Sequence, residues 1–184
     1  MKKKLLIAAL LVIAVSILAV GTAAYNSSRA YTHSVITSGG VKIQLSETML
    51  NEKGSEVAYK NPDTLVPGQS VSKIVRVTNL EKDAFVRVKV ELVGKLADGT
   101  TKTVPLTIDY NDAKWVKAAD GWYYYKQGLK TGEITEPLFK TVTLSGADMD
   151  NSWQGAKIEI KVTAQGLQTA NNGTDPVKAS GWSN

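Results

Sequence analysis

One stretch of this chain decides its fold: residues 85–92, which read Phe-Val-Arg-Val-Lys-Val-Glu-Leu. Apolar and charged side chains alternate along it, so that one face carries Val86, Val88, Val90 and Leu92 and the other carries Arg87, Lys89 and Glu91. Successive side chains of a β-strand point to opposite faces of a sheet, and an antiparallel strand commonly has one buried and one solvated face. The stretch therefore predicts a strand that covers one side of a hydrophobic core.

The same alternation, rich in β-branched residues, recurs along the chain between turn signals. The turn dipeptides are Pro67-Gly68 and Asp98-Gly99, and the further strand candidates are residues 41–45, 71–77, 106–110, 121–126, 138–144 and 156–164. No long segment has the helical period, although residues 50–58 or 147–153 would fit a short helical turn. We therefore expect an all-β fold, a jelly roll or β-sandwich of about eight to nine antiparallel strands. This domain would span residues 41–170, preceded by an N-terminal signal helix and followed by a C-terminal tail over residues 171–184, of which we expect residues 171–180 to be frayed.

The chain opens with the pattern of a secretory signal. Three lysines at positions 2–4 precede an uncharged apolar run over residues 5–20, as in signal peptides. Gly21 and Ala23 then fit the −3 and −1 positions of a cleavage site, so we expect residues up to 23 to be removed and the mature chain to begin at Ala24. We expect a secreted protein, extracellular or at the cell surface, that touches the membrane only through its signal. The apolar run and the small residues after it are also long enough to span a membrane, so an uncleaved, membrane-anchored β-domain stays open as an alternative.

The composition removes several classes of function. The chain has 184 residues, no cysteine, a single histidine (His33) and a formal net charge of +5. Of its 22 basic residues, three leave with the signal, so the mature chain keeps 19 against 17 acidic residues, a charge of about +2. No basic run tracks a phosphate backbone, so we expect no nucleic-acid partner. One histidine without cysteine builds neither a two-histidine zinc site nor a Cys–His pair. We therefore expect no catalytic residues, no metal site and no cofactor.

Aromatic residues gather at Trp115 and at residues 122–125, which read Trp-Tyr-Tyr-Tyr. Aromatic faces on a β-sandwich can stack on sugar rings, so Trp115, Trp122 and Tyr124 form a candidate aromatic surface. A cell-surface carbohydrate-binding module is accordingly an alternative function. Alternation sends Trp122 and Tyr124 to one face of a strand and the other two tyrosines to the opposite face, so one pair must face the core. This favours core and assembly packing over sugar binding.

The segment behind the cleavage site, residues 24–36, is strand-prone, and Gly39-Gly40 separates it from the next strand. The residues leave two interpretations open. The segment is either an ordinary first strand paired inside its own subunit or a detachable donor strand that completes the sheet of the next subunit. In the second interpretation, a glycine pair supplies the backbone freedom for a hinge. The assembly residues are then Tyr25, Tyr31, His33, Val35 and Ile36, and the hinge residues are Gly39 and Gly40.

Several short blocks of the chain resemble the exported matrix-fibre proteins related to TasA and camelysin of Gram-positive bacteria. The similar blocks are the lysine-led leader, Gly-Thr-Ala-Ala-Tyr-Asn at residues 21–26, Ser-Gly-Gly-Val-Lys-Ile-Gln-Leu at 38–45 and Leu-Val-Pro-Gly-Gln-Ser-Val-Ser-Lys at 65–73. Residues 122–126, 137–139 and 164–168 look like a clostridial-type branch of these proteins.

The resemblance implies a jelly-roll domain that polymerises with copies of itself into extracellular biofilm matrix fibres. It implies cleavage by a SipW-type signal peptidase and insertion of residues 24–36, as a donor strand, into the neighbouring subunit. Matrix polysaccharide or an accessory matrix protein would be further partners. Some relatives have been described as metalloproteases, but this sequence has no zinc ligand set. We therefore expect a secreted structural subunit of a matrix fibre, without catalysis.

Overall fold

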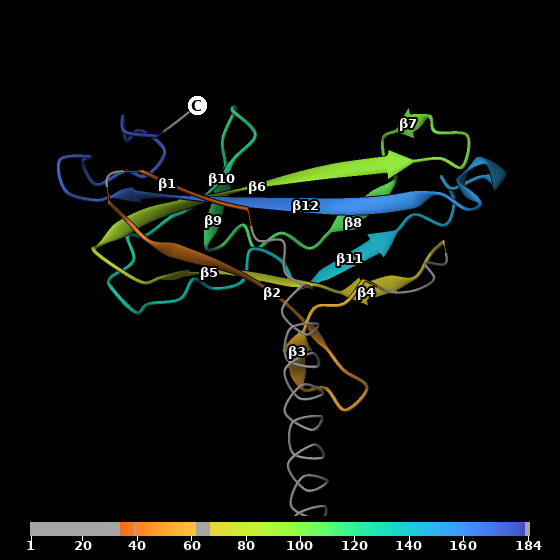
Figure 1. The fold of residues 1–184 in the computed structure, drawn as a ribbon, viewed down its shortest axis with the longest axis horizontal. Helices are drawn as coiled ribbons and strands as arrows, with labels where there is room; N and C mark the ends of the chain where they lie inside the picture. Colours follow the sequence, from red (N-terminus) through yellow and green to blue (C-terminus); the bar gives the residue numbers. More distant parts are fainter. Residues whose placement is uncertain (1–33, 39, 62–66, 183–184) are drawn as a thin grey trace, which may run out of the picture. The chain divides into compact units, whose positions relative to one another are not determined.

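The computed structural model describes residues 34–38, 40–61 and 67–182. Its strands are β1 (Ser34–Ser38), β2 (Ile43–Leu50), β3 (Glu56–Ala58), β4 (Ser70–Ser72), β5 (Ile74–Asn79), β6 (Ala84–Lys95), β7 (Thr101–Lys102), β8 (Leu106–Ile108), β9 (Trp115–Lys117), β10 (Tyr123–Tyr125), β11 (Thr141–Leu144) and β12 (Lys157–Gln168), with a 3-10 helix η2 (Asn151–Trp153). They form one six-stranded and two three-stranded sheets (Figure 1). The all-β, β-sandwich fold expected from the sequence is confirmed, and the expected signal helix lies outside the described residues.

The described part of the chain has twelve strands, where the sequence pattern predicted about eight to nine. The additional strands are β3, β4, β7 and β9, each of only two or three residues. Alternation needs about four residues to be recognised, so strands this short leave no clear pattern in the sequence.

The six-stranded sheet is built on β6 and β12, which pair antiparallel over all twelve residues of each strand. The strand order is β1-β12-β6-β10-β9, and β7 pairs with the far end of β6. As the alternation predicts, Val86 and Val88 of β6 are fully buried, and Val90 packs against the same core. The Asp98-Gly99 turn joins β6 to β7, with Gly99 at a φ of +88°, a left-handed conformation that glycine adopts without strain.

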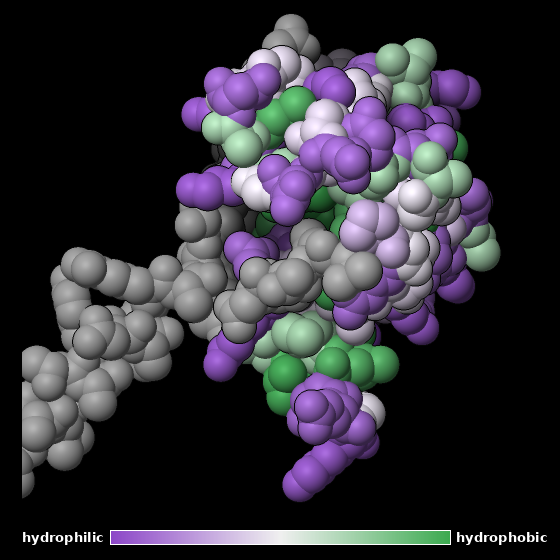
Figure 2. Space-filling model, turned by 90° about the vertical axis from the view of Figure 1, so that its right-hand side faces the viewer, coloured by the Kyte–Doolittle hydropathy of each residue, from purple (hydrophilic) through white to green (hydrophobic). Residues whose placement is uncertain are grey.

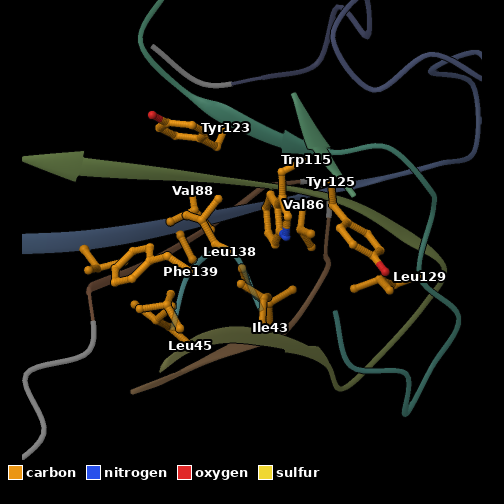
Figure 3. Packing of buried hydrophobic residues seen from close by; sticks show 14 of the residues in the cluster. Ile43, Leu45, Val86, Val88, Trp115, Tyr123, Tyr125, Leu129, Leu138 and Phe139 are labelled. Carbon is orange, nitrogen blue, oxygen red and sulfur yellow. The ribbon is translucent and has the colours of Figure 1, made fainter. Parts of the chain in front are cut away.

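The core lies between this sheet and the two small sheets, whose orders are β3-β2-β5 and β4-β11-β8. Figure 3 shows Ile43 and Leu45 of β2 on one side of the core and Val86 and Val88 of β6 on the other. Leu138 and Phe139 lie between these two groups. The outer face of the large sheet points away from this core, and its residues make a separate set of contacts.

The predicted strand over residues 71–77 is in fact two strands, and Lys73 is the break between them. β4 pairs with β11 in one small sheet, while β5 pairs with β2 in the other. Lys73 is buried, with its Nζ 3.1 Å from Glu47 Oε1 and 3.7 Å from the ring centroid of Tyr59. Burial lowers the pKa of Lys73, and the charge and hydrogen bond of Glu47 act against that shift. The prediction of one strand is wrong because the alternating pattern runs on through a residue at which the chain changes sheets.

Residues 50–58, for which the sequence allowed a short helical turn, instead close a hairpin between β2 and β3. The Asn51 side chain accepts the N–H groups of Lys53 and Ser55, which fixes the turn. Leu50 and Val57 are 46% and 38% exposed on this hairpin. Figure 2 shows an apolar patch at the lower end of the described chain, where Figure 1 draws the hairpin. The other expected helical turn, at residues 147–153, is confirmed as η2, whose N-terminal cap is Asp150.

Candidate assembly site

The N-terminal strand β1 lies at the edge of the six-stranded sheet (Figure 1) and, among the described strands, pairs with β12 alone. The pairing is parallel, with Val35 opposite Ala164 and Ile36 opposite Gln165. All other strand pairs of the described chain are antiparallel. In this chain the strand is therefore paired inside its own subunit, in a position where a single neighbouring strand holds it.

After β1 the chain turns from the large sheet into β2 of the opposite layer. Gly40 stands at this turn with a φ of +72°, which favours glycine over every residue that carries a Cβ. The next inward-facing side chains, Val41 and Ile43, pack on β12 at Gly166. A Cβ on Gly166 would lie 2.9 Å from Val41 Cγ1 and from Ile43 Cγ2, closer than such atoms approach. Glycine at position 166 therefore lets β2 pack closely against β12, the strand with which β1 pairs.

On the outer face of the same sheet, Arg87 of β6 is buried, with only 5% of its surface exposed. Its Nε and Nη2 both donate to Gln165 Oε1 of β12, at 2.9 and 2.7 Å. Its Nη1 donates to the Tyr124 hydroxyl of β10 at 2.8 Å and lies 3.4 Å from Asp120 Oδ2. The guanidinium thus joins three adjacent strands, and Gln165, opposite Ile36, is one of its anchors.

Two tryptophans lie close to this guanidinium. The Arg87 Cζ is 4.3 Å from the ring centroid of Trp122 and 4.7 Å from that of Trp182. Stacking of this kind suits arginine because its planar, weakly hydrated cation is attracted to aromatic faces. We call Arg87, Asp120, Trp122, Tyr124, Gln165 and Trp182 the Arg87 cluster.

Within the cluster, the Tyr124 hydroxyl donates a 2.6 Å hydrogen bond to Asp120 Oδ2. Burial raises the pKa of Tyr124, and this hydrogen bond raises it further. Burial also acts to raise the pKa of Asp120, but the hydrogen bonds from Tyr124 and from the Trp122 N–H, with the nearby Arg87 charge, hold that pKa below its usual value. Asp120 is therefore ionised and Tyr124 neutral at neutral pH, which is the charge state that Arg87 needs.

The C-terminal segment, predicted to be a frayed tail, is instead docked on the outer face of the sheet. Trp182 and the buried Ala179 pack against Phe85 and Leu167, which are themselves buried. The Trp182 indole N–H donates to the carbonyl of Pro176 at 2.8 Å, which closes the segment on itself. The prediction fails because polar and glycine-rich composition describes a segment without regard to the surface that it can cover.

The candidate aromatic surface is not a surface. Trp115 is 1% exposed and lies in the main core beside Tyr125 (Figure 3). Its indole N–H donates to the carbonyl of Glu136. Tyr124 is 2% exposed, inside the Arg87 cluster, and Trp122 is half-buried. The expected alternation is confirmed, because Tyr123 and Tyr125 face the core and Tyr124 faces outward. The expected exposure of Trp115 and Tyr124 is wrong, because Trp115 belongs to the core and the C-terminal segment covers the outward side at Tyr124.

The remaining predicted site residues lie outside the described residues. They are the cleavage positions Gly21, Ala23 and Ala24, the assembly residues Tyr25, Tyr31 and His33, and the hinge residue Gly39. Within the part of the chain that the structure covers, no helix has the length and apolar character needed to cross a membrane. The same part holds no group of three metal-ligating side chains.

The sequence does not single out the Arg87 cluster. Arg87 stands in the same alternating row as Lys89 and Glu91, and only the fold distinguishes the buried charge from the two more exposed ones. Gln165 lies in the block of residues 164–168 that carries the family resemblance, but nothing in that block indicates a partner for a buried arginine, and Trp182 belongs to no block that the sequence singles out. The sole signal was the aromatic run at residues 122–125, which pointed to the right strand and the wrong role.

Comparison with known proteins does not assign this chain to a family, so its class of protein is described from the fold and the candidate site. No family model matches the chain, and neither the curated proteins nor the solved structures give a match. The structure itself defines an all-β sandwich whose N-terminal strand is a parallel edge strand and whose C-terminal segment closes the outer face.

Proposed function

We propose that this protein is a secreted structural subunit of extracellular matrix fibres, which polymerises when the N-terminal strand of one subunit enters the sheet of the next. One observation carries the proposal. The first described strand, β1, is a five-residue edge strand held by a single neighbour, and it follows a leader with the pattern of a secretory signal. A strand in this position can leave its own sheet without breaking any other strand pair of the described residues.

Strand addition is chemically suited to such a site. An edge strand presents unpaired N–H and C=O groups, and an extended segment from another chain can satisfy them as the native strand does. Exchange of an identical element between subunits is a low-cost route to assembly, because each subunit receives from its neighbour the same strand that it gives away. A head-to-tail contact of this kind builds an open filament when the rotation between successive subunits does not close a ring, and this proposal takes that open form.

The leader gives the exchange its timing. While the signal holds the N-terminus at the membrane, the strand behind it cannot reach another subunit. Cleavage before Ala24 frees it. A signal peptidase of the SipW type, the self-contact and a matrix polysaccharide or accessory protein are the partners that this proposal includes, and it includes neither catalysis nor a cofactor.

Carbohydrate binding is not favoured by any specific contact in the described chain. That function would require Trp122 and its neighbouring tyrosines in an exposed row, and Tyr123, Tyr124 and Tyr125 are all buried. The membrane-anchored alternative depends on residues before Ser34. The intact mass of the exported protein separates it from the proposal, because a mature chain that begins at Ala24 carries no anchor at its N-terminus.

Electron microscopy of the mature chain at neutral pH tests the proposal. We expect fibres from the chain that begins at Ala24 and none from the same chain without residues 24–36. As a matched control, a peptide of residues 24–38 added to the intact chain should shorten the fibres by capping acceptor sites, and a shuffled peptide should not. Fibres from the truncated chain would show that the strand is dispensable and the proposal wrong.

A further inference from the structure

The C-terminal segment and β1 meet the same stretch of β12 from different directions. β1 pairs through its backbone with residues 163–167, along the edge of the sheet. The C-terminal segment, residues 171–182, lies instead on the outer face, where Ala179 and Trp182 pack in one apolar cluster with Leu167. Residues 163–167 therefore carry contacts to both elements, and a change in one contact can reach the other.

The first contact on the outer face joins Gly181 to Leu167. A Cβ at Gly181 would lie 2.7 Å from Leu167 Cδ1 and 2.9 Å from Asn172 Oδ1, so the backbone of the C-terminal segment lies directly on both side chains. Leu167 is 2% exposed and pairs with Ser38, the last residue of β1. In so closely packed a contact, a shift of Leu167 requires a shift of the C-terminal segment.

The second contact runs through Arg87. The Trp182 ring centroid lies 4.7 Å from Arg87 Cζ, and Arg87 donates two hydrogen bonds to Gln165 Oε1, at 2.9 and 2.7 Å. Gln165 pairs with Ile36, in the middle of β1. Trp182 also meets the Tyr124 ring edge-on, at a centroid distance of 5.6 Å. The C-terminal segment thus holds the guanidinium, and the guanidinium holds the central residue of the stretch that pairs with β1.

The C-terminal segment is tied together by its own hydrogen bonds. The Trp182 indole N–H donates to the Pro176 carbonyl at 2.8 Å. At the start of the segment, Asn172 Nδ2 donates to the carbonyl of Gln168 at 3.0 Å, one residue past the stretch that pairs with β1. A compact loop packed by its own side chains docks as one unit, so we expect the loss of Trp182 to loosen the other contacts as well.

These contacts fix Gln165 and Leu167, two outward side chains of a stretch whose backbone must stay extended to pair with β1. An edge strand with one neighbour is bound only as firmly as that neighbour is ordered, because each interstrand hydrogen bond needs its partner group in place. Docking of the C-terminal segment and pairing of β1 therefore favour each other. Such a coupling is reciprocal, so whatever loosens one element loosens the other by the same free energy.

We propose that the C-terminal segment is a lock on β12, which while docked keeps residues 163–167 in the geometry that binds an N-terminal strand. The bound strand is the subunit's own β1 or, in a fibre, that of a second copy, and undocking of the C-terminal segment weakens its binding. Trp182 is the positioning residue of this lock, because it acts on the strand through Arg87 and Leu167. The inference rests on the fibre function proposed above and names the regulation of its acceptor site.

Hydrogen exchange followed by mass spectrometry tests the lock in the mature chain, at a concentration too low for fibres. Trp182→Ala removes the ring from Arg87 and the hydrogen bond to Pro176, so we expect residues 34–38 to exchange several-fold faster. Residues 141–144 of β11 serve as the internal reference. They pair with β4 and β8 in a different sheet, so their exchange should keep its rate.

Two further variants separate the docking of the C-terminal segment from a general effect of substitution. Gly181→Val leaves Trp182 in place but puts a side chain where Leu167 lies, so it should raise the exchange of residues 34–38 as Trp182→Ala does. The matched control is Lys178→Ala. The Lys178 side chain is 84% exposed and forms a 3.5 Å ion pair within the segment, so its removal should leave the exchange rate unchanged.

The reverse direction is tested by a substitution in β1. Val35→Pro and Ile36→Pro are made together, because alternate residues of a strand in a parallel ladder direct their N–H groups to the neighbour. One of the two prolines therefore removes an N–H that pairs with β12. The coupling predicts that residues 171–182 then exchange several-fold faster, again with residues 141–144 unchanged.

The exchange rates decide the coupling within one subunit. Faster exchange of residues 34–38 in both undocking variants, but not in the control, and faster exchange of residues 171–182 in the proline variant support the lock. An unchanged rate at residues 34–38 overturns it. An equal rise at residues 141–144 also overturns it, because the substitutions would then act through the stability of the whole domain. Either of these results leaves the fibre function standing.

Fibres decide the role of the lock in assembly. Fibres of Trp182→Ala should dissolve at a lower urea concentration than fibres of Lys178→Ala, because each acceptor holds its strand less firmly. Equal urea concentrations would overturn this role. If the unsubstituted mature chain forms no fibres, the proposed function fails, while the exchange rates still support or overturn the lock on β1.

Discussion

Replacement of Arg87 by alanine tests whether the Arg87 cluster holds the outer face of the sheet together. The substitution removes both hydrogen bonds to Gln165 Oε1, and Gln165 is itself buried. A buried acceptor left without its donor costs about 1–3 kcal/mol. The loss of stacking on Trp122 and Trp182 adds about 0.5–2 kcal/mol for each ring. Because such contributions overlap, we expect the free energy of unfolding to fall by about 2–5 kcal/mol.

Equilibrium unfolding in urea, followed by tryptophan fluorescence, measures this change. The matched control is Lys89→Ala, two residues along the same face of β6. The Lys89 side chain is 41% exposed, and its Nζ lies 3.9 Å from Glu91 Oε1, which is a long and weak ion pair. Removal of this side chain should therefore lower the free energy of unfolding by about 0.5 kcal/mol or less. Arg87→Lys keeps the positive charge but not the planar guanidinium group, so it should lower the free energy of unfolding nearly as much as Arg87→Ala does. If Arg87→Ala unfolds at the same urea concentration as Lys89→Ala, the cluster does not hold the face and the reasoning is refuted.

Three further predictions concern the packing around the same sheets. Gly166→Ala should lower the free energy of unfolding by about 1–3 kcal/mol, because the new Cβ would lie 2.9 Å from Val41 and Ile43; an unchanged urea midpoint would contradict this close approach. Glu47→Gln should cost about 3 kcal/mol at pH 7, because Lys73 stays buried and loses its partner. Since burial lowers the pKa of Lys73, the unfolded chain binds more protons above that pKa, so the stability of this variant should rise from pH 7 toward pH 9.5; a fall in its unfolding midpoint over that range would contradict the assignment. Deletion of residues 171–184 should uncover Phe85 and Leu167, each worth about 1.5–3 kcal/mol of burial, and should increase binding of a hydrophobic dye; a true frayed tail could be removed without either effect.

Much of the fold could be predicted from local pattern. The alternation at residues 85–92 and 156–164 predicts β6 and β12, and these strands do form the longest ladder of the described chain. Side chains that alternate between apolar and charged reach a low free energy in few other ways, because any other backbone period would bury the charges. The turn at Asp98-Gly99 could likewise be predicted, since it depends on the backbone freedom of one residue.

The candidate site could be predicted only in part. The pattern of residues 24–36 and the glycine pair leaves a detachable strand open as one of two interpretations, and the described part of that segment lies in β1, at the edge of the six-stranded sheet. No local pattern predicts that β1 pairs in parallel with β12, because the paired residues lie about 130 positions apart in the sequence. The burial of Arg87 depends in the same way on Trp122, Gln165 and Trp182, which only the folded chain brings together.

Local sequence is enough to establish most of the strands of this protein and which of their faces are apolar, because both properties follow from neighbours one or two residues apart. The pairing of the strands, the change of sheets at Lys73 and the covering of the outer face by the C-terminal segment depend on the folded chain. These features depend on the free energies of contacts between segments that are distant in the sequence, and a local pattern carries no information about such contacts. For the same reason, the pattern of residues 30–36 predicts a strand, and only the structure shows that its described part pairs in parallel with β12.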